Sequence, residues 1–157
     1  MSEIGVKPRG FVYRINLKWT ESKKGVLSSP GKPKIEVATP PDFRGHPGIW
    51  SPEELFVASV NVCIMTTFLY YAQRENVKFL SYESSAEGVL EKSERGLAFT
   101  SIKVIPKITV RLINDIEKIK NLIYLSEKNC LISNSIKSKV TVIPEVKVIS
   151  EENNQNG

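Results

Sequence analysis

The two cysteines, Cys63 and Cys130, are the residues of this chain with the most distinctive chemistry. Neither has a second cysteine at the spacing of a Cys-x-x-Cys motif, which is typical of zinc sites and thioredoxin-like redox sites. Two cysteines are also too few for a disulfide scaffold. If the thiols act together, the fold must bring them together from distant parts of the chain.

The surroundings of the two cysteines in the sequence predict different reactivities. Cys63 lies in an apolar run, and free cysteine is among the most buried side chains, where apolar surroundings disfavour the thiolate. Cys130 follows one predicted helix and precedes another, a position where helix-dipole charge favours a thiolate. From the residues alone, we expect Cys130 to be the more reactive thiol.

Three other residues are candidates for a site. The single histidine, His46, leaves no His-based metal site or catalytic triad, and we interpret it as a loop residue of "DFRGHPG". Arg44 in the same loop either reaches a buried anion or is a solvated charge. Lys23, in "TESKKG", is most simply part of a polar hairpin turn. The chain has no dinucleotide-binding, P-loop or H-E-x-x-H motif.

Composition and charge set the class of protein. The chain has 157 residues, 41% of them hydrophobic, which suits one domain with a core. Its 22 Lys/Arg and 17 Asp/Glu are scattered, so nucleic-acid binding rests only on the net charge of +5. The N-terminus lacks the apolar segment of a secretory signal, and we expect a cytoplasmic protein. We expect a flexible segment over 1–9, one domain over 10–150 and a disordered polar tail over 151–157.

A long helix is predicted over about residues 51–75. Ser51 is the expected N-cap, Pro52 occupies the first helical position, and Glu54 completes a capping box. The uncharged run from Leu55 to Ala72 approaches the length of a membrane span, but polar residues interrupt it and its start is typical of a soluble helix. We interpret it as a core helix that is apolar nearly all round and needs cover from a second copy.

The remaining segments predict strands and one amphipathic helix. Alternating patterns indicate strands at 11–19 and 32–40, a long hairpin formed by 79–92 and 97–112, and a last strand at 139–149. Pro106 is expected to mark a bulge or an edge. A helix is predicted over 114–129, with Asn114 or Asp115 as its cap, and a short helical turn over 131–137. This order favours an α+β fold.

Two motifs resemble those of a known family. "SPEELFVASVNVCIMTTF" resembles the cysteine motif of the OsmC/Ohr family, the osmotically inducible and organic hydroperoxide resistance proteins, and "NCLISNSI" resembles the second cysteine motif. The glycine-rich "PPDFRGHPGIW" and the strand pattern also match, so the resemblance spans nearly the whole chain. It implies an OsmC-like fold with antiparallel sheets packed around a long central helix, in an intertwined homodimer with active sites at the interface.

The resemblance also implies an activity and roles for residues. It implies a thiol-dependent peroxidase acting on organic hydroperoxides, with hydrogen peroxide as a further candidate. By position, Cys63 matches the thiol that attacks peroxide, Cys130 the resolving thiol, and Glu53 the carboxylate that orients a cation; this reverses the reactivity order expected above. The implied partners are a peroxide, an external dithiol reductant and a second copy, and the implied chemistry needs no metal or bound cofactor. The scattered charges and the interrupted apolar run lead us to expect no nucleic acid and no membrane.

The sequence departs from the family pattern at two positions. In the organic hydroperoxide branch an arginine in the first hairpin activates the thiol, whereas Lys23 lies nearest here and lacks the two-pronged geometry of arginine. Arg44 is the alternative cation. The second cysteine is followed by Leu131, where the family often has proline. The rival function is an OsmC-fold protein that binds a small acyl or aromatic ligand while its cysteines stay inert.

Overall fold

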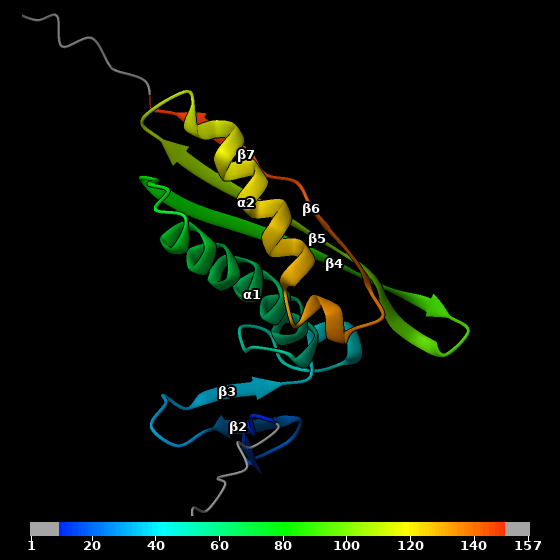
Figure 1. Cartoon of the computed structure of the whole chain (residues 1–157). Helices are drawn as coiled ribbons and strands as arrows, with labels where there is room; N and C mark the ends of the chain where they lie inside the picture. Colours follow the sequence, from blue (N-terminus) through cyan, green and yellow to red (C-terminus); the bar gives the residue numbers. More distant parts are fainter. Residues whose placement is uncertain (1–9, 150–157) are drawn as a thin grey trace, which may run out of the picture. The chain divides into compact units, whose positions relative to one another are not determined.

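The structure is a computed structural model and describes residues 10–149 (Figure 1). The chain divides into two compact units, Met1–Glu54 and Leu55–Gly157. The segments that we expected to be flexible or disordered, 1–9 and 151–157, lie outside the described residues. The assignment of 10–150 to one domain stays a prediction.

The first unit contains a three-stranded antiparallel sheet. Its strands are β1 (Asn16–Trp19), β2 (Lys24–Ser28) and β3 (Ile35–Ala38), in the order β1-β2-β3. The predicted strands at 11–19 and 32–40 are confirmed in their central or final parts only.

The strand β2 was not predicted, because its first residue was read as part of a turn. The turn is shorter than expected: Ser22 adopts a positive φ of 47°, and the N–H of Lys24 donates to the carbonyl of Glu21 at 2.9 Å. Lys24 therefore already pairs with Ala38 as the first residue of β2.

The glycine-rich segment after β3 forms a compact turn. A short 3₁₀ helix, η1 (Pro41–Phe43), is followed by Gly45, where a Cβ would overlap the backbone carbonyl of Thr39. Glycine is therefore required there, because no side chain fits. The N–H of Ala38 donates to the carbonyl of Trp50 at 2.9 Å, so the segment returns to the sheet before the long helix begins.

The long helix, α1 (Pro52–Arg74), begins as predicted. The N–H of Ser51 donates to Oε2 of Glu54 at 3.0 Å, and the N–H of Glu54 donates to Oγ of Ser51 at 3.2 Å. These reciprocal bonds are the expected capping box, and Pro52 occupies the first helical position. The predicted bounds, about 51–75, agree with the helix to within a residue at each end.

One face of α1 is buried and the opposite face keeps apolar side chains exposed. Ile64 and Phe68 are fully buried, whereas Val62 and Tyr70 are 53% and 59% exposed. By length and composition alone the helix could cross a membrane, with a mean hydropathy of 1.7 over 18 residues. Only 28% of that window is buried within the molecule, although the core helix of a soluble protein can pass the same test.

The second unit contains a four-stranded sheet. Its strands are β4 (Ser81–Ser93), β5 (Gly96–Val110), β6 (Lys139–Val142) and β7 (Glu145–Val148). The predicted long hairpin is confirmed, because β4 and β5 pair antiparallel along their whole length.

The expectation of antiparallel sheets is wrong for β6 and β7, which both run parallel to β5. The reason is the helix between β5 and β6. This helix, α2 (Asp115–Asn129), carries the chain back along the sheet, so that the next strand runs in the same direction as β5. The predicted last strand is also two strands, since Pro144 interrupts it and has no N–H to donate.

Pro106 lies inside β5. The prediction that it marks a bulge is wrong, whereas it does lie where one side of the strand has no partner. It is paired with Ser84 of β4, and the register shift of the hairpin lies between Val89 and Leu90. Pro106 is tolerated in a central strand because β6 pairs with Ser101–Val104 and β7 with Lys107–Val110, which leaves it between the two ladders.

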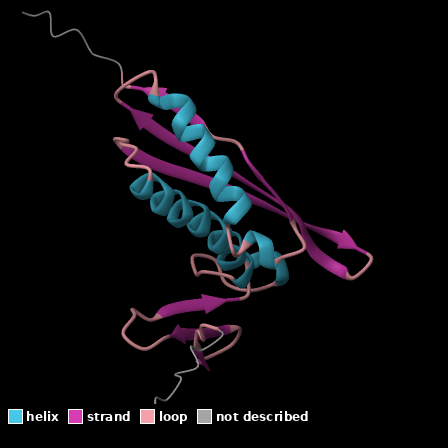
Figure 2. Ribbon diagram, in the orientation of Figure 1, coloured by secondary structure: helices cyan, strands magenta, loops and turns pink. Residues whose placement is uncertain are grey.

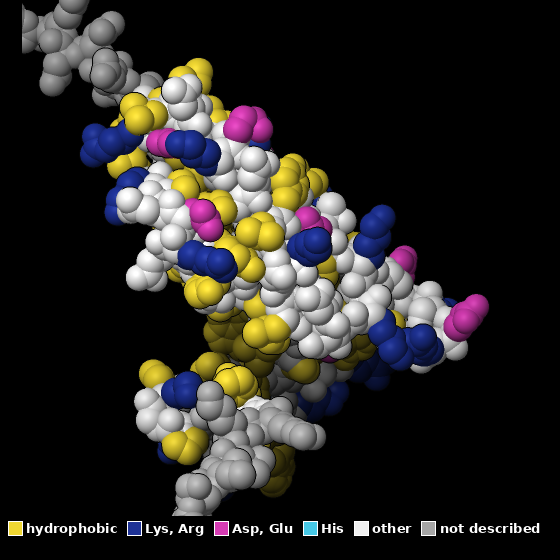
Figure 3. All heavy atoms as spheres, in the orientation of Figure 1, with side chains coloured by type: hydrophobic (Ala, Val, Ile, Leu, Met, Phe, Trp, Pro, Cys, Tyr) yellow, Lys and Arg dark blue, Asp and Glu magenta, His cyan; other side chains and the backbone are white. Residues whose placement is uncertain are grey.

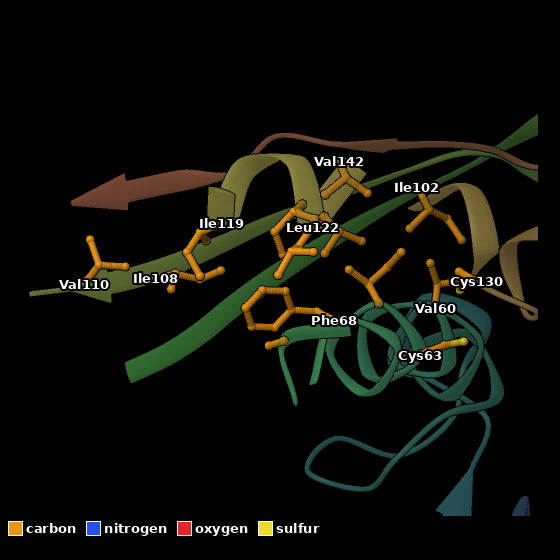
Figure 4. Packing of buried hydrophobic residues seen from close by; sticks show 14 residues of the cluster. Val60, Cys63, Phe68, Ile102, Ile108, Val110, Ile119, Leu122, Cys130 and Val142 are labelled. Atoms are coloured by element: carbon orange, nitrogen blue, oxygen red, sulfur yellow. The ribbon is translucent and has the colours of Figure 1, made fainter. Parts of the chain in front are cut away.

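Both helices contribute to one hydrophobic core against this sheet (Figure 2). Ser126 completes the buried stripe of α2. Of the two predicted cap residues, Asn114 occupies the cap position, without a capping hydrogen bond from its side chain. Figure 4 shows the core, whose buried members come from α1, α2, β5, β6 and the residue after α2: Val60, Cys63, Ile64, Phe68, Ala72, Ile102, Val104, Ile108, Val110, Ile119, Leu122, Ile123, Cys130 and Val142.

Candidate functional site

The two cysteines meet at one end of the core of the second unit. Cys63 projects from α1, and Cys130 is the residue that ends α2. Both are free thiols; Cys63 is 8% exposed and Cys130 is fully buried. Figure 4 shows them at the same end of the core, and the Cys63 side chain is near enough to affect the pKa of Cys130. Residues far apart in the sequence thus form a pair.

The environment of Cys130 opposes its ionisation. Burial raises the pKa of the Cys130 thiol above its usual value, and interaction with the Cys63 side chain raises it further, while hydrogen bonding from Ser133 acts in the opposite direction. The expectation that helix-dipole charge favours a Cys130 thiolate is therefore not met. Cys130 caps the C-terminal end of α2, and the helical turn that follows, η2 (Ser133–Ser135), has only three residues.

Cys63 has a hydroxyl one helical turn away and an opening nearby. Its Sγ lies 3.9 Å from Oγ1 of Thr67. Thr67 also lines a shallow cavity of about 350 Å³, together with Thr66, Tyr70, Tyr71 and Asn129. Since Asn129 immediately precedes Cys130, the cavity adjoins residues next to both thiols.

The two candidate cations, both in the first unit, differ in their hydrogen bonding. The ammonium of Lys23 donates to the carbonyl oxygens of Phe43 and Arg44, at 3.1 and 3.0 Å. Lys23 therefore holds the turn after β3 in addition to lying in the first hairpin. Arg44 is exposed, has a φ of 57°, and its backbone N–H donates to the carbonyl of Pro41. Its side chain forms no salt bridge within residues 10–149.

Glu53 and His46 each bury a polar atom that has no hydrogen-bond partner among the described residues: Oε2 of Glu53 and Nε2 of His46. Buried polar atoms are nearly always paired. Glu53 lies in the first turn of α1. A cation or hydrogen-bond donor that contacts the Glu53 carboxylate would remove the cost of burying its oxygen without a partner.

Sequence reasoning missed two hydroxyl residues beside the thiols, Thr67 and Ser133. The signals were present: Thr67 follows Cys63 by one helical turn, and Ser133 completes a Cys-x-x-Ser spacing. No group of three or more His, Cys, Asp or Glu that could hold a metal is found within the part of the chain that the structure describes.

The charges of the second unit are mixed in sign. On the face seen in Figure 3, Lys and Arg side chains lie among Asp and Glu side chains. The salt bridges along α2, Lys118–Asp115 and Lys120–Glu117, illustrate this arrangement.

Solved structures share this fold. An OsmC-like protein of unknown function from Vibrio cholerae matches 89% of this chain and 100% of its own, with a TM-score of 0.76 and 22% identity. An organic hydroperoxide resistance protein from Legionella pneumophila matches 89% of this chain and 98% of its own, with a TM-score of 0.64 and 20% identity. An organic hydroperoxide resistance protein from Elizabethkingia anophelis matches 88% of this chain and 99% of its own, with a TM-score of 0.68 and 20% identity. At these identities the likeness is one of fold.

The sequence of the chain matches one protein family. No curated protein matches the chain significantly. The family model described as OsmC-like protein matches residues 45–145, which include the loop before α1, both cysteines and the four-stranded sheet up to the start of β7. The α+β arrangement of two sheets and two helices agrees with the solved structures above. The chain therefore belongs to the OsmC-like family.

Proposed function

We propose that this protein is a thiol-dependent peroxidase that reduces organic hydroperoxides, with hydrogen peroxide as a second candidate substrate. The observation that carries the proposal is the pairing of Cys63 and Cys130 at one end of the core. Two further findings support the proposal: the chain belongs to the OsmC-like family, and organic hydroperoxide resistance proteins share its fold. We place the reaction in the cytoplasm.

The proposed cycle uses two thiols and one external reductant. The Cys63 thiolate attacks the outer oxygen of the hydroperoxide, the O–O bond breaks, and the alkoxide leaves with a proton as the alcohol. Cys63 is then a sulfenic acid, which condenses with the Cys130 thiol to give a disulfide and water. A dithiol reduces the disulfide and resets both thiols. The scheme requires no metal and no bound cofactor.

The burial of the two thiols supports this division of roles. Cys130 is fully buried and its pKa is raised, which suits a thiol that reacts only with a sulfenic acid beside it. Cys63 is buried but keeps 8% of its surface exposed, and Thr67, whose hydroxyl lies 3.9 Å from the Cys63 sulfur, lines a shallow cavity.

The proposed site also needs a cation near the thiolate. Glu53 has a buried oxygen without a partner among the described residues, as expected of a carboxylate that orients a cation. Lys23 is held by two carbonyl oxygens, whereas the Arg44 side chain is exposed and forms no salt bridge within residues 10–149. We therefore favour Arg44, whose guanidinium can contact a carboxylate and a thiolate together.

The proposed active form is a homodimer. Glu53 and Cys63 are ten residues apart on α1, about 15 Å along the axis of a straight helix, too far to share one small pocket. Two copies of α1 that pack antiparallel about a two-fold axis bring Glu53 of one chain toward Cys63 of the other. The same contact would cover the exposed apolar side chains of Val62 and Tyr70.

Single-turnover consumption of peroxide tests the proposed function. The reduced protein is mixed with one equivalent of cumene hydroperoxide or hydrogen peroxide, and free thiols are counted before and after. We expect each equivalent consumed to remove two thiols and a dithiol to restore them. Peroxide left unconsumed and an unchanged thiol count would favour the rival function, a small-ligand binding protein with inert cysteines.

A further inference from the structure

Ser133 contacts the sulfur of Cys130 through its backbone and carries a buried hydroxyl beside this contact. Its N–H donates to the Cys130 Sγ at 3.5 Å. Its Oγ is buried and has no partner of ordinary hydrogen-bond geometry among the described residues, yet the side chain lowers the pKa of Cys130. A buried hydroxyl without a settled partner next to a sulfur can donate to that sulfur when it becomes charged.

The backbone around the pair fixes this arrangement. The N–H of Cys130 donates to the carbonyl of Glu127 at 3.4 Å, which ties it to the end of α2. Its carbonyl accepts from the N–H of Asn134 at 3.0 Å, and the N–H of Ser135 donates to the carbonyl of Ile132 at 3.0 Å. Ser133 thus lies inside a hydrogen-bonded turn that begins at Cys130, so its position relative to the sulfur does not depend on a flexible loop.

The resolving step needs this help more than the first step does. The nucleophile in thiol chemistry is the thiolate, but the Cys130 sulfur is fully buried among apolar side chains. Charge on a buried sulfur is costly unless donors are directed at it. The N–H of Ser133 is already directed at this sulfur, and the buried Ser133 hydroxyl is a second group that can turn toward it.

We propose that Ser133 is a positioning residue for the resolving thiol: it donates hydrogen bonds to the Cys130 sulfur as negative charge develops there. The inference rests on the proposed peroxidase function for its role in the cycle. In that step the Cys130 sulfur attacks the sulfenic sulfur of Cys63, the S–S bond forms and the S–O bond breaks. The thiol proton ends on the departing hydroxide as water, so the peroxide already consumed is the only oxidant required.

The first test does not depend on peroxidase activity. In the Cys63→Ser background, Cys130 is the only thiol, and its ionisation is followed by the ultraviolet absorbance of the thiolate against pH, with the variant lacking both cysteines as the blank. We expect Ser133→Ala to shift the midpoint upward by about half a unit to one unit, which is a threefold to tenfold lower thiolate fraction near neutral pH. Ser133→Thr, which keeps the hydroxyl, should restore the midpoint.

Ser135→Ala is the matched control. The Ser135 hydroxyl donates to the carbonyl of Leu131 at 2.6 Å, whereas the hydrogen bond to the Cys130 sulfur comes from Ser133. Ser135→Ala therefore measures the effect of losing a serine hydroxyl from the same turn. Circular dichroism of each variant checks that the fold is kept. The proposal is overturned if Ser133→Ala has the same midpoint as Ser135→Ala.

The second test follows the resolving step in the chain that keeps both cysteines. After one equivalent of peroxide, Ser133→Ala should accumulate the Cys63 sulfenic acid, detected with a dimedone-type probe, and form the disulfide about threefold to tenfold more slowly than Ser135→Ala. An equal rate of disulfide formation would overturn the role in resolution. If no variant forms a sulfenic acid while the midpoint still shifts, the peroxidase function fails and the contact between Ser133 and the thiolate stands.

Discussion

At the scale of single residues, the two chemically identical thiols have different surroundings. Cys130 is fully buried with a raised pKa, and Cys63 is slightly exposed beside the hydroxyl of Thr67. From the sequence context alone, Cys130 was expected to be the more reactive thiol. Neighbours along the chain are a poor guide here, because the apolar side chains around Cys130 come from other elements.

Substitution of each cysteine should separate the two chemical steps. Cys63→Ser should abolish peroxide reduction, because the attacking sulfur is lost. Cys130→Ser should reduce about one equivalent of peroxide and leave a sulfenic acid that a dimedone-type probe can trap. Stopped-flow consumption of cumene hydroperoxide with mass spectrometry measures both. If Cys63→Ser keeps the first turnover and Cys130→Ser loses it, the two roles are reversed.

The choice between the two cations can be measured by thiol reactivity. In the Cys130→Ser background, Arg44→Ala should slow the alkylation of Cys63 near neutral pH by about tenfold, because a charge-assisted donor to the thiolate is lost. Lys23→Ala should slow it less and instead lower stability by about 1 kcal/mol, because its ammonium holds the carbonyls of Phe43 and Arg44. A larger effect of Lys23→Ala on alkylation would return the role to the first hairpin.

The burial of Tyr82 predicts a loss of stability at high pH. Desolvation raises the pKa of Tyr82 from 10.0 to about 12, so the folded state keeps its phenolic proton while the unfolded state releases it. Stability from this group is fully present below pH 10.0 and falls as the pH rises toward about 12. Urea unfolding across this range should show a smaller decline for Tyr82→Phe than for Tyr124→Phe, a matched change at a residue that is 52% exposed. Equal declines would contradict the prediction.

At the scale of elements, interactions between neighbouring residues determine where α1 begins, whereas pairing between distant segments determines the arrangement of the last strands. The capping box of α1 is local and formed as the sequence indicated. The division of the last strand at Pro144 and the parallel pairing of β6 and β7 depend on how α2 returns the chain to β5. Pro106 is accepted in a central strand only because the break at Pro144 leaves a gap opposite it.

Loss of the cap should weaken α1 measurably. Ser51→Ala removes a buried hydroxyl that accepts from the N–H of Glu54, and we expect the free energy of unfolding to fall by about 1 kcal/mol. Ser59→Ala is the control, because Ser59 lies inside the same helix and bonds only the carbonyl of Phe56. Chemical denaturation followed by circular dichroism compares the two. A Ser51→Ala variant as stable as Ser59→Ala would show that the cap contributes little.

At the scale of the whole molecule, the exposed apolar face of α1 needs an explanation. Val62, Leu69 and Tyr70 are 53%, 39% and 59% exposed on a helix that is otherwise part of the core. We propose that a second copy of the helix covers this face and also brings Glu53 toward Cys63, which one straight helix cannot do. The dimer is therefore part of the proposed site as well as a means of burying surface.

Complementation between two inactive chains tests this assembly. Cys63→Ser and Glu53→Ala chains are unfolded, mixed in equal amounts and refolded together. Random pairing makes half of the dimers mixed, and each contains one site with both residues intact, so we expect about one quarter of the wild-type activity. Native mass spectrometry confirms that mixed dimers have formed. No recovery in proven mixed dimers, with both parents inactive, would mean that Glu53 does not act on the partner's site.

The sequence alone determined what depends on neighbouring residues. Ser51, Pro52 and Glu54 determine the start of α1, and the pattern of the hairpin determines β4 and β5, because caps, turns and alternation act over a few residues. The order of motifs around the two cysteines was enough to indicate the OsmC-like family.

Only the tertiary structure decided what depends on distant parts of the chain. It brought Cys63 and Cys130 together, buried the second thiol and placed Ser133 against its sulfur. It also set the direction of β6 and β7 and assigned the ammonium of Lys23 to two carbonyls about twenty residues away. Burial and pairing of this kind are set by packing between elements, and a pattern along one segment carries no information about which other segment will cover it.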